Sequence, residues 1–207
     1  MSADVMPPES FEFTANNVAA AKAIIAKYPE GRQASAVMPL LDIAQRQHDG
    51  WIPKAAMDHI ADMLDMPPIR VYEVASFYTM YNLAPIGRHH VQVCTNLPCW
   101  LRGSEQVMAA CKDKLSIGNG ETTADGEFTL LEVECLGACV NAPMMQIGDD
   151  YYEDLDSETT GQILDDLKAG RVPKAGSQVA RHTCEPIGGL TSLADQEPLR
   201  KEKAGGS

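Results

Sequence analysis

The stretches VQVCTNLPC (residues 91–99) and EVECLGAC (residues 132–139) determine how this chain is interpreted. Each carries a pair of cysteines: Cys94 and Cys99 in the first, Cys135 and Cys139 in the second. Four thiolates are what a [2Fe–2S] cluster needs, because each iron takes two sulfur ligands besides the bridging sulfides. Structural zinc also accepts four thiolates, usually in pairs with roughly two to four intervening residues. The pairs here have four and three intervening residues, at the wide end of that range, and neither is Cys-x2-Cys. The spacing therefore favours an iron–sulfur cluster and leaves zinc binding or disulfide pairing open.

The residues inside the two stretches agree with a metal-binding loop. Gly137 lies within the second pair, where a glycine lets a loop wrap a bulky cluster without a Cβ in the way. Pro98 stiffens the approach to Cys99. Two further cysteines are not expected to be ligands. Cys111 lies at helical spacing in an apolar pattern, which predicts a small core residue, and the role of Cys184 is left open.

Composition and charge exclude several classes of protein. The 207 residues carry a formal net charge of −12, and residues 89–170 hold 15 of the 29 acidic side chains but 4 of the 17 basic ones. We expect no nucleic-acid partner, because phosphate binding needs a positive surface. No apolar run approaches the roughly 20 residues of a membrane span, so no membrane insertion is expected. The acidic N-terminus lacks the features of a secretory signal, which predicts a reducing compartment and disfavours disulfides.

The first part of the chain has the pattern of a helical bundle. Amphipathic stretches follow Thr14, Ser35, Pro53 and Pro67. Because short links join them, we predict an N-terminal extension over residues 1–13 and a helical bundle domain over 14–86. The last stretch carries an aromatic run: Tyr72, Phe77, Tyr78 and Tyr81. Core packing is the favoured interpretation of this run, and an interface with a partner subunit is the alternative.

The pattern changes after the link at residues 83–88, which contains Pro85 and Gly87. Alternating and helical stretches then predict strands at 89–94, 129–134, 144–147 and 150–153 and helices at 100–115 and 157–169. Two of these strands end at the cysteine pairs, so the pairs can meet at one edge of a sheet. The fold class predicted for the whole chain is α+β, with a mixed domain over residues 87–170.

Residues 171–207 are rich in proline, glycine and serine and show little apolar periodicity. We predict an extended C-terminal interaction tail that becomes ordered against a partner. Deletion of residues 175–207 is therefore expected to weaken assembly and to leave the metal centre intact.

The cysteine stretches resemble the thioredoxin-like [2Fe–2S] subunit of respiratory complex I, NADH:quinone oxidoreductase. Further similar runs are VYEVASFYTMY (71–81), YYEDL (151–155) and EPIGGLTSL (185–193), so the resemblance covers nearly the whole chain. It implies a thioredoxin-like [2Fe–2S] ferredoxin domain over residues 87–170. It also implies one [2Fe–2S] cluster with these ligands: Cys94, Cys99, Cys135 and Cys139.

The function implied by the resemblance is that of an electron-carrying redox subunit. Single electrons would be exchanged with the FMN of a neighbouring NADH-oxidising flavoprotein subunit, so FMN and NADH are expected there and not on this chain. Neither a catalytic acid–base residue nor a hydride-transfer site is expected here. Other peripheral-arm subunits would be partners, at the cytoplasmic face of the bacterial inner membrane or on the mitochondrial matrix side. The alternatives are the same module in a soluble NAD-linked hydrogenase or formate dehydrogenase, or a zinc-stapled thioredoxin-like binding protein.

Overall fold

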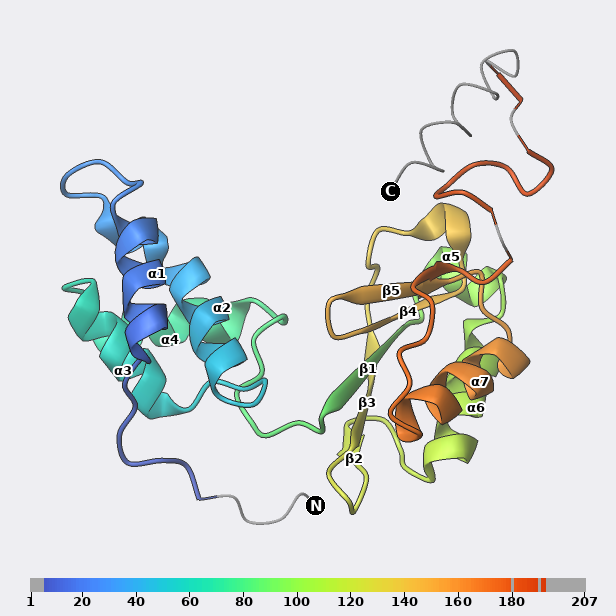
Figure 1. Cartoon of the computed structure of the whole chain (residues 1–207), viewed down its shortest axis with the longest axis horizontal. Coiled ribbons are helices and arrows are strands. Elements are labelled where there is room, and N and C mark those ends of the chain that lie inside the picture. Colours follow the sequence, from blue (N-terminus) through green and yellow to red (C-terminus); the bar gives the residue numbers. More distant parts are fainter. Residues whose placement is uncertain (1–5, 180, 190, 193–207) are drawn as a thin grey trace. The chain divides into compact units, whose positions relative to one another are not determined.

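The computed structural model describes residues 6–179, 181–189 and 191–192 (Figure 1). The chain divides into two compact units, which we describe separately. The first contains the residues up to Arg88 together with Ala124–Thr129, and the second contains His89–Thr123 and the residues from Leu130 onward. Among the described residues, the helices are too short or too polar to cross a membrane.

The first unit is helical, as its sequence predicts. Its described residues form α1 (Ala15–Ile25), η1 (Gln33–Ala36), α2 (Val37–Gln47), α3 (Lys54–Met63) and α4 (Pro68–Phe77). The side chain of Thr14 caps α1 by accepting a hydrogen bond from the backbone N–H of Asn17. The apolar faces of the helices share one core, which contains Leu40, Ile60 and Val71. Burial of these faces stabilises helices that are too short to persist alone.

The aromatic run at the end of α4 is mostly exposed. Tyr81 is buried and its Oη donates to the carbonyl oxygen of Met38 at 2.9 Å. Tyr72, Phe77 and Tyr78 are exposed, and Phe77 keeps 76% of its surface. The prediction of core packing is therefore wrong for these three side chains. The buried face of α4 carries Val71 and Ala75 instead, and Tyr72 lies about 100° around the helix from Val71. The backbone leaves the helix at Tyr78.

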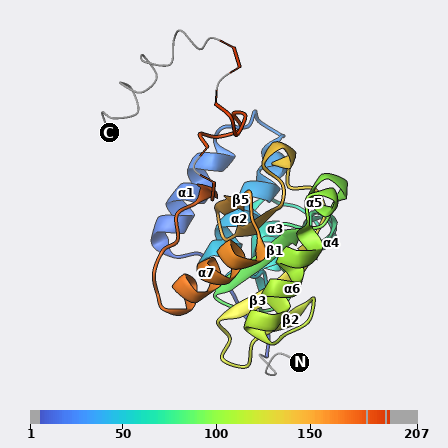
Figure 2. The ribbon, with the colours of Figure 1, turned by 90° about the vertical axis from the view of Figure 1, so that its right-hand side faces the viewer.

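The described part of the chain forms a six-stranded sheet with strand order β2-β3-β1-β4-β5-β6, most of which belongs to the second unit. The strands are β1 (His89–Cys94), β2 (Glu121–Thr122), β3 (Phe128–Val133), β4 (Met144–Ile147), β5 (Asp150–Glu153) and β6 (Gly176–Ser177). The helices are α5 (Leu97–Leu101), α6 (Ser104–Leu115), η2 (Cys139–Asn141) and α7 (Ser157–Lys168). Strand β1 pairs antiparallel with β4, and β4 pairs antiparallel with β5 in the predicted hairpin. Helices α6 and α7 lie side by side on one face of this sheet (Figures 1 and 2).

The predicted helix over residues 100–115 is divided in the structure. Helix α5 starts earlier, at Leu97, and ends before Gly103, whose φ of +103° interrupts the helical backbone. Glycine adopts this left-handed conformation at low cost. Because of the break, Cys99 lies on a short helix of its own, capped by Asn96.

The segment predicted as an extended tail is partly packed. Strand β6 pairs parallel with β5, with Gly176 opposite Tyr152 and Ser177 opposite Glu153. The side chain of Arg181 is also buried against this unit. The described residues of this segment are extended, as predicted, but β6 and Arg181 attach its first part to the second unit. Its last part, residues 193–207, lies outside the described residues.

Candidate metal centre

The two cysteine pairs lie at the ends of neighbouring strands. Cys94 is the last residue of β1, and Cys135 follows β3 closely. The backbone N–H of Thr95 donates to the carbonyl oxygen of Val133 at 3.2 Å, so the carboxyl ends of the two strands are side by side. Cys99 and Cys139 follow on the short helices α5 and η2. Residues distant in sequence therefore meet at one edge of the sheet.

Side-chain hydrogen bonds connect the two cysteine loops. Thr95 Oγ1 donates to Glu132 Oε1 at 2.7 Å, and Asn96 Nδ2 donates to Glu134 Oε2 at 2.5 Å. Asn96 Oδ1 also accepts from the backbone N–H of Leu97 at 2.9 Å, which caps α5. Asn96 thus caps the helix that carries Cys99 and also links this helix to Glu134, the residue before Cys135.

The pairs differ in their surroundings. Cys94 and Cys99 are 2% and 1% exposed and pack in an apolar cluster with Met144. Cys135 and Cys139 are exposed, and their sulfur atoms are 3.4 Å apart. The site therefore has one buried side and one side that faces solvent.

The thiols share one electrostatic environment. Burial raises the pKa of Cys99 to about 12, and the hydrogen bond and charge of Cys94 contribute to this rise. The pKa of Cys139 is raised by its hydrogen bond with Cys135, and the charge of Cys94 also acts on it. The neighbouring thiols thus disfavour the thiolate forms of Cys99 and Cys139, whereas a metal cation reverses this preference because a coordinating thiol is deprotonated.

Backbone geometry shapes the second cysteine loop. The N–H of Gly137 donates to Cys135 Sγ at 3.4 Å, and the φ of Gly137 is +88°, a conformation that favours glycine. Tyr151 Oη donates to the carbonyl oxygen of Leu136 at 2.8 Å. The loop is therefore held to β5 while its sulfur atoms stay at the surface.

The donor set fits a [2Fe–2S] cluster. Thiolates are soft ligands that suit iron–sulfur clusters, and each of the two irons takes two of them. The arrangement of two separate thiol pairs matches the two irons of a binuclear cluster.

The other two cysteines are separate from these pairs. Cys111 is fully buried on α6, as predicted for a core residue, and burial raises its pKa to about 12. Cys184 is exposed, in the segment that follows β6.

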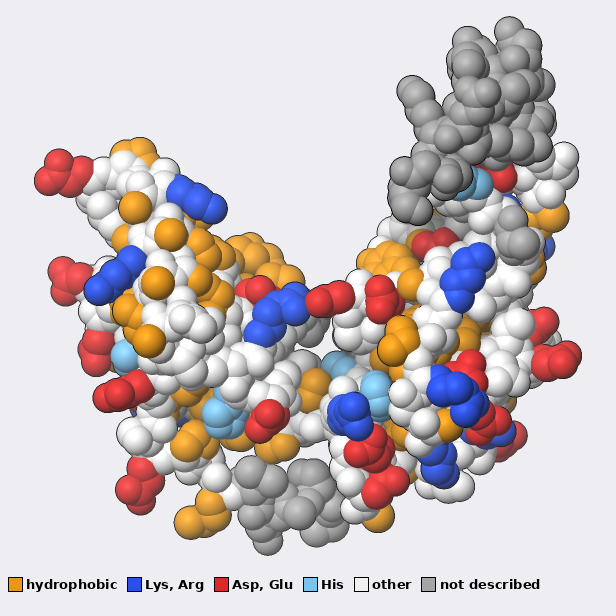
Figure 3. All heavy atoms as spheres, viewed as in Figure 1, with side chains coloured by type: hydrophobic (Ala, Val, Ile, Leu, Met, Phe, Trp, Pro, Cys, Tyr) orange, Lys and Arg blue, Asp and Glu red, His pale blue; other side chains and the backbone are white. Residues whose placement is uncertain are grey.

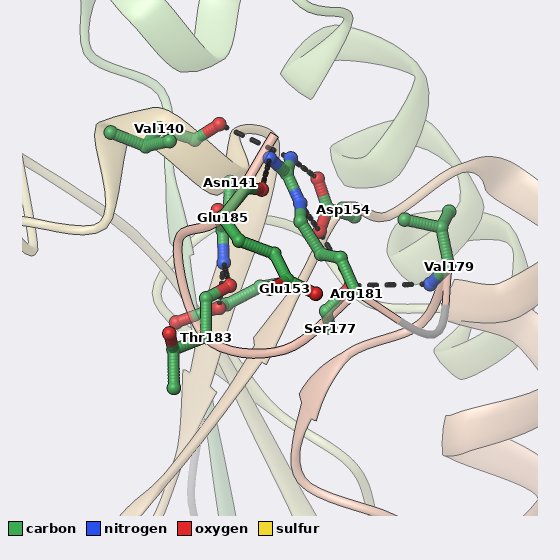
Figure 4. Close-up of polar contacts among 9 residues, drawn as sticks. All are labelled: Val140, Asn141, Glu153, Asp154, Ser177, Val179, Arg181, Thr183 and Glu185. Atoms are coloured by element: carbon green, nitrogen blue, oxygen red, sulfur yellow. Dashed lines mark hydrogen bonds and ion pairs between the residues drawn. The ribbon is translucent and has the colours of Figure 1, made fainter. Parts of the chain in front are cut away.

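Sequence reasoning missed the residues that support the second loop: Tyr151, and the three that Figure 4 shows, Asn141, Asp154 and Arg181. The sequence contains one signal for these residues, because YYEDL, which resembles the family, includes Tyr151 and Asp154. Nothing in the pattern, however, indicates that Asp154 pairs with a residue 27 positions further along.

A mixed α/β domain with two thiol pairs at one sheet edge defines an iron–sulfur domain of the ferredoxin type. Residues 21–168 match the family of thioredoxin-like [2Fe-2S] ferredoxins. The chain is also 55% identical over 159 residues to a subunit of the NADH-quinone oxidoreductase of Rickettsia bellii, covering 77% of this chain and 95% of the relative. It therefore belongs to the thioredoxin-like [2Fe–2S] ferredoxin family, and its cofactor is one [2Fe–2S] cluster.

Two further comparisons agree with this membership. NADH dehydrogenase [ubiquinone] flavoprotein 2, mitochondrial, of Dictyostelium discoideum is 52% identical over 185 residues, which are 89% of this chain and 75% of the relative. Among solved structures, an NAD+-reducing [NiFe]-hydrogenase in the air-oxidised state matches with a TM-score of 0.55 and 20% identity. That match covers 63% of this chain and 23% of the hydrogenase chain. At this identity the likeness shows a shared fold.

Proposed function

We propose that this chain is the electron-carrying subunit of an NADH:quinone oxidoreductase, respiratory complex I, and that its cluster has these ligands: Cys94, Cys99, Cys135 and Cys139. The observation that carries the proposal is the meeting of the two thiol pairs at the ends of β1 and β3. The relatives named as subunits of such oxidoreductases, at 55% and 52% identity, support the assignment to complex I.

The residues around the site have distinct tasks. A bound [2Fe–2S] cluster supplies one-electron transfer. Cys94 and Cys99 would hold it from the buried side, where Met144 and its neighbours exclude water. Cys135 and Cys139 would hold it from the exposed side, which leaves a short path to a partner. The N–H of Gly137 donates to the sulfur of Cys135, and such hydrogen bonds to sulfur tune the potential of a cluster.

The hydride of NADH requires a different site. NADH gives up two electrons together as a hydride, whereas an iron–sulfur centre takes one electron at a time. The hydride acceptor is therefore the FMN of a neighbouring flavoprotein subunit, which also binds NADH. This chain is a redox subunit of the complex without a hydride-transfer site of its own, and its side chains need perform no acid–base catalysis.

Exposed apolar side chains next to the thiols support docking onto a partner. Leu97, Trp100 and Leu101 of α5 are exposed beside Cys99, and Val140 is exposed beside Cys139. Hydrophobic side chains reach the surface of both units (Figure 3). Clusters of exposed apolar residues mark interaction sites when they exceed the scatter normal for a protein surface. We assign the surface around the thiols to the flavoprotein subunit, and the exposed aromatic side chains of α4 to contacts with peripheral-arm subunits.

The proposed assembly implies a location for the chain, and one alternative assembly has some support. In a bacterium the chain would lie at the cytoplasmic face of the inner membrane as part of the complex, and in a mitochondrion on the matrix side. The alternative is the same module in an NAD-linked hydrogenase or formate dehydrogenase. The hydrogenase likeness supports it only at the level of the fold, at 20% identity, so complex I is the better-supported assignment.

Single cysteine variants test the ligand assignment. Replacing any one of the four proposed ligands with Ala removes one of the two thiolates of an iron, so each variant should lose most of its iron and acid-labile sulfide. Cys111→Ala and Cys184→Ala are matched controls that should retain both. Full cluster content in Cys139→Ala, or its loss in Cys184→Ala, would contradict the assignment.

Reduction by NADH tests the role in the complex. NADH added to the isolated chain should leave its visible spectrum unchanged, because the chain has no hydride acceptor. Adding the FMN-containing subunit should allow NADH to bleach the spectrum. Bleaching by NADH alone would contradict the proposal. Recovery of hydrogenase subunits with the chain from native cells, in place of quinone oxidoreductase subunits, would favour the alternative.

A further inference from the structure

A segment beyond the last helix returns to the second cysteine loop. We call the described residues of 176–189 the C-terminal strap. The strap begins with β6, which extends the sheet at β5, and the backbone N–H of Gln178 donates to the carbonyl oxygen of Glu153 at 3.0 Å. From this point the strap passes beside η2, the short helix that starts at Cys139 (Figure 4).

Arg181 is the strongest link between the strap and the loop. Its guanidinium pairs with the carboxylate of Asp154: Nε donates to Oδ2 at 2.8 Å and Nη2 donates to Oδ1. The two side chains are 7% and 4% exposed. Nη2 also donates to the carbonyl oxygen of Val140 at 3.2 Å, and Nη1 to that of Glu185 at 3.1 Å. One side chain thus joins the residue after Cys139, the end of β5 and the strap itself.

Asn141 provides a second link that does not involve the ion pair. Its Nδ2 donates to Glu153 Oε2 at 2.6 Å and to the carbonyl oxygen of Thr183 at 2.8 Å. The backbone carbonyl of Asn141 accepts from the N–H of Asp154 at 2.7 Å. Asn141 is 4% exposed, so these contacts are shielded from water. The helical turn that starts at Cys139 is therefore fastened on two sides.

The contacts made by the strap fix the position of the second cysteine loop. A buried ion pair contributes little net stability, because removing two charges from water costs about as much as their attraction returns. Ser177 Oγ donates to Asp154 Oδ2 at 2.6 Å, so the carboxylate has partners beyond the guanidinium. A planar guanidinium with several fixed acceptors has one geometry available, which fixes the carbonyl of Val140 in space. The packing of Leu136 and Ala138 against the apolar cluster is not directional in this way.

We infer that Arg181 is a positioning residue for the iron–sulfur centre: through Val140 and Asp154 it fixes the loop that presents Cys139. The inference rests on the proposed ligand set. Groups that orient ligands from behind commonly change metal affinity by about 10–100-fold when they are removed. The strap therefore governs how long the cluster persists and how uniform its ligand geometry is.

The test compares cluster retention in Arg181→Gln and the unaltered full chain. The two readouts are the rate of iron release to a chelator and the line shape of the paramagnetic signal of the reduced cluster. We expect iron release to be about tenfold faster or more in Arg181→Gln, with a broadened or split signal. Arg181→Lys, which retains the charge and part of the contacts, should recover part of both effects.

The matched control is Arg171→Gln, which removes an arginine from an exposed pair with Asp166 in the same C-terminal region. It should behave as the unaltered chain. Because a lone buried carboxylate can prevent folding, the double variant Asp154→Asn/Arg181→Gln removes both charges together. It should fold and still release iron faster, since the contact to Val140 is lost.

Unaltered iron release and line shape in folded Arg181→Gln, even with a lower melting temperature, would show a purely structural strap and overturn the inference. An equal change in Arg171→Gln would overturn it as well. Retention of the cluster in Cys139→Ala would instead refute the ligand assignment, so the two failures are distinguishable.

Discussion

The two thiol pairs of this chain are held by different means. Cys94 and Cys99 lie in the apolar interior, on the end of β1 and on α5, with Met144 packed against them. Cys135 and Cys139 lie on an exposed loop that is held by hydrogen bonds from Tyr151, Asn141 and Arg181. Burial in the apolar cluster is the main restraint on the first pair, whereas polar contacts add to the packing of Leu136 and Ala138 in holding the second.

This difference shows how a protein can place a cofactor near its surface. Burial would hold both pairs firmly but would keep the centre away from a partner. A loop at the surface permits close approach, yet it needs polar restraints in place of a core. The comparison predicts that core changes and strap changes will have separable effects on stability and on iron retention.

Removal of the strap should have the largest effect. Deleting residues 175–207 removes β6 and Arg181, and with them the pairing of β6 with β5 and the contacts of Arg181 to Asp154 and Val140. We expect rapid iron loss in a chain whose first unit stays folded, contrary to the sequence-based expectation that this deletion spares the metal centre. Deleting residues 193–207 is the control, since the contacts described above do not involve them. Equal iron retention in both deletions would refute the role of the strap.

Met144→Ala tests the buried side. Met144 is 1% exposed against the first thiol pair, and truncating such a side chain costs about 3 kcal/mol. Denaturant unfolding followed by circular dichroism should show this loss. Iron release from folded molecules should change less than in Arg181→Gln. Met80→Ala, at an exposed position, should change neither quantity. Iron release from Met144→Ala that is as fast as from Arg181→Gln would contradict the comparison.

Asp154→Asn tests the ion pair and its pH dependence. Burial alone would raise the pKa of Asp154, but hydrogen bonds from Arg181 and Ser177 hold it below its usual value. Because the folded-state pKa lies below the unfolded one, the carboxylate stabilises fully above about pH 4, and this is lost as the pH falls through the lowered pKa. The variant should lose about 2 kcal/mol at pH 7. Unfolding curves at several pH values should show the difference shrinking in acid; a difference that grows there would refute the argument.

Tyr151→Phe should have the smallest effect. It removes the hydrogen bond to the carbonyl of Leu136, worth about 1 kcal/mol, and leaves the ring in place. Iron release should rise slightly, because the strap still holds the other end of the loop. Tyr72→Phe on the exposed face of α4 serves as the control. An effect of Tyr151→Phe as large as that of Arg181→Gln would mean that the strap is not the main restraint.

Local sequence patterns predicted most of the fold. Strands at 89–94, 144–147 and 150–153 have the predicted limits, because alternation and turn residues act within a few positions. The break at Gly103 was missed, since a glycine inside a helical pattern can be tolerated or can end the helix. The exposure of Tyr78 was missed as well, because helical spacing has no meaning beyond Phe77, the last residue of α4.

The site was predicted only in part, because local sequence patterns do not show contacts between residues that are distant in the chain. Cysteine spacing and the resemblance named the four thiols, whose ligand role remains a proposal. The difference in burial between the pairs depends on tertiary packing, and the pairing of Arg181 with Asp154 depends on the path of the strap. Neither feature produces a periodic pattern that can be recognised in a single sequence.

The central claim is that both thiol pairs together hold one binuclear cluster. Metal and acid-labile sulfide analysis of the purified full chain, combined with the paramagnetic signal after one-electron reduction, tests it most directly. The account predicts about two irons and two sulfides per chain and a signal equivalent to about one spin. A single iron or zinc per chain, without labile sulfide, would contradict it.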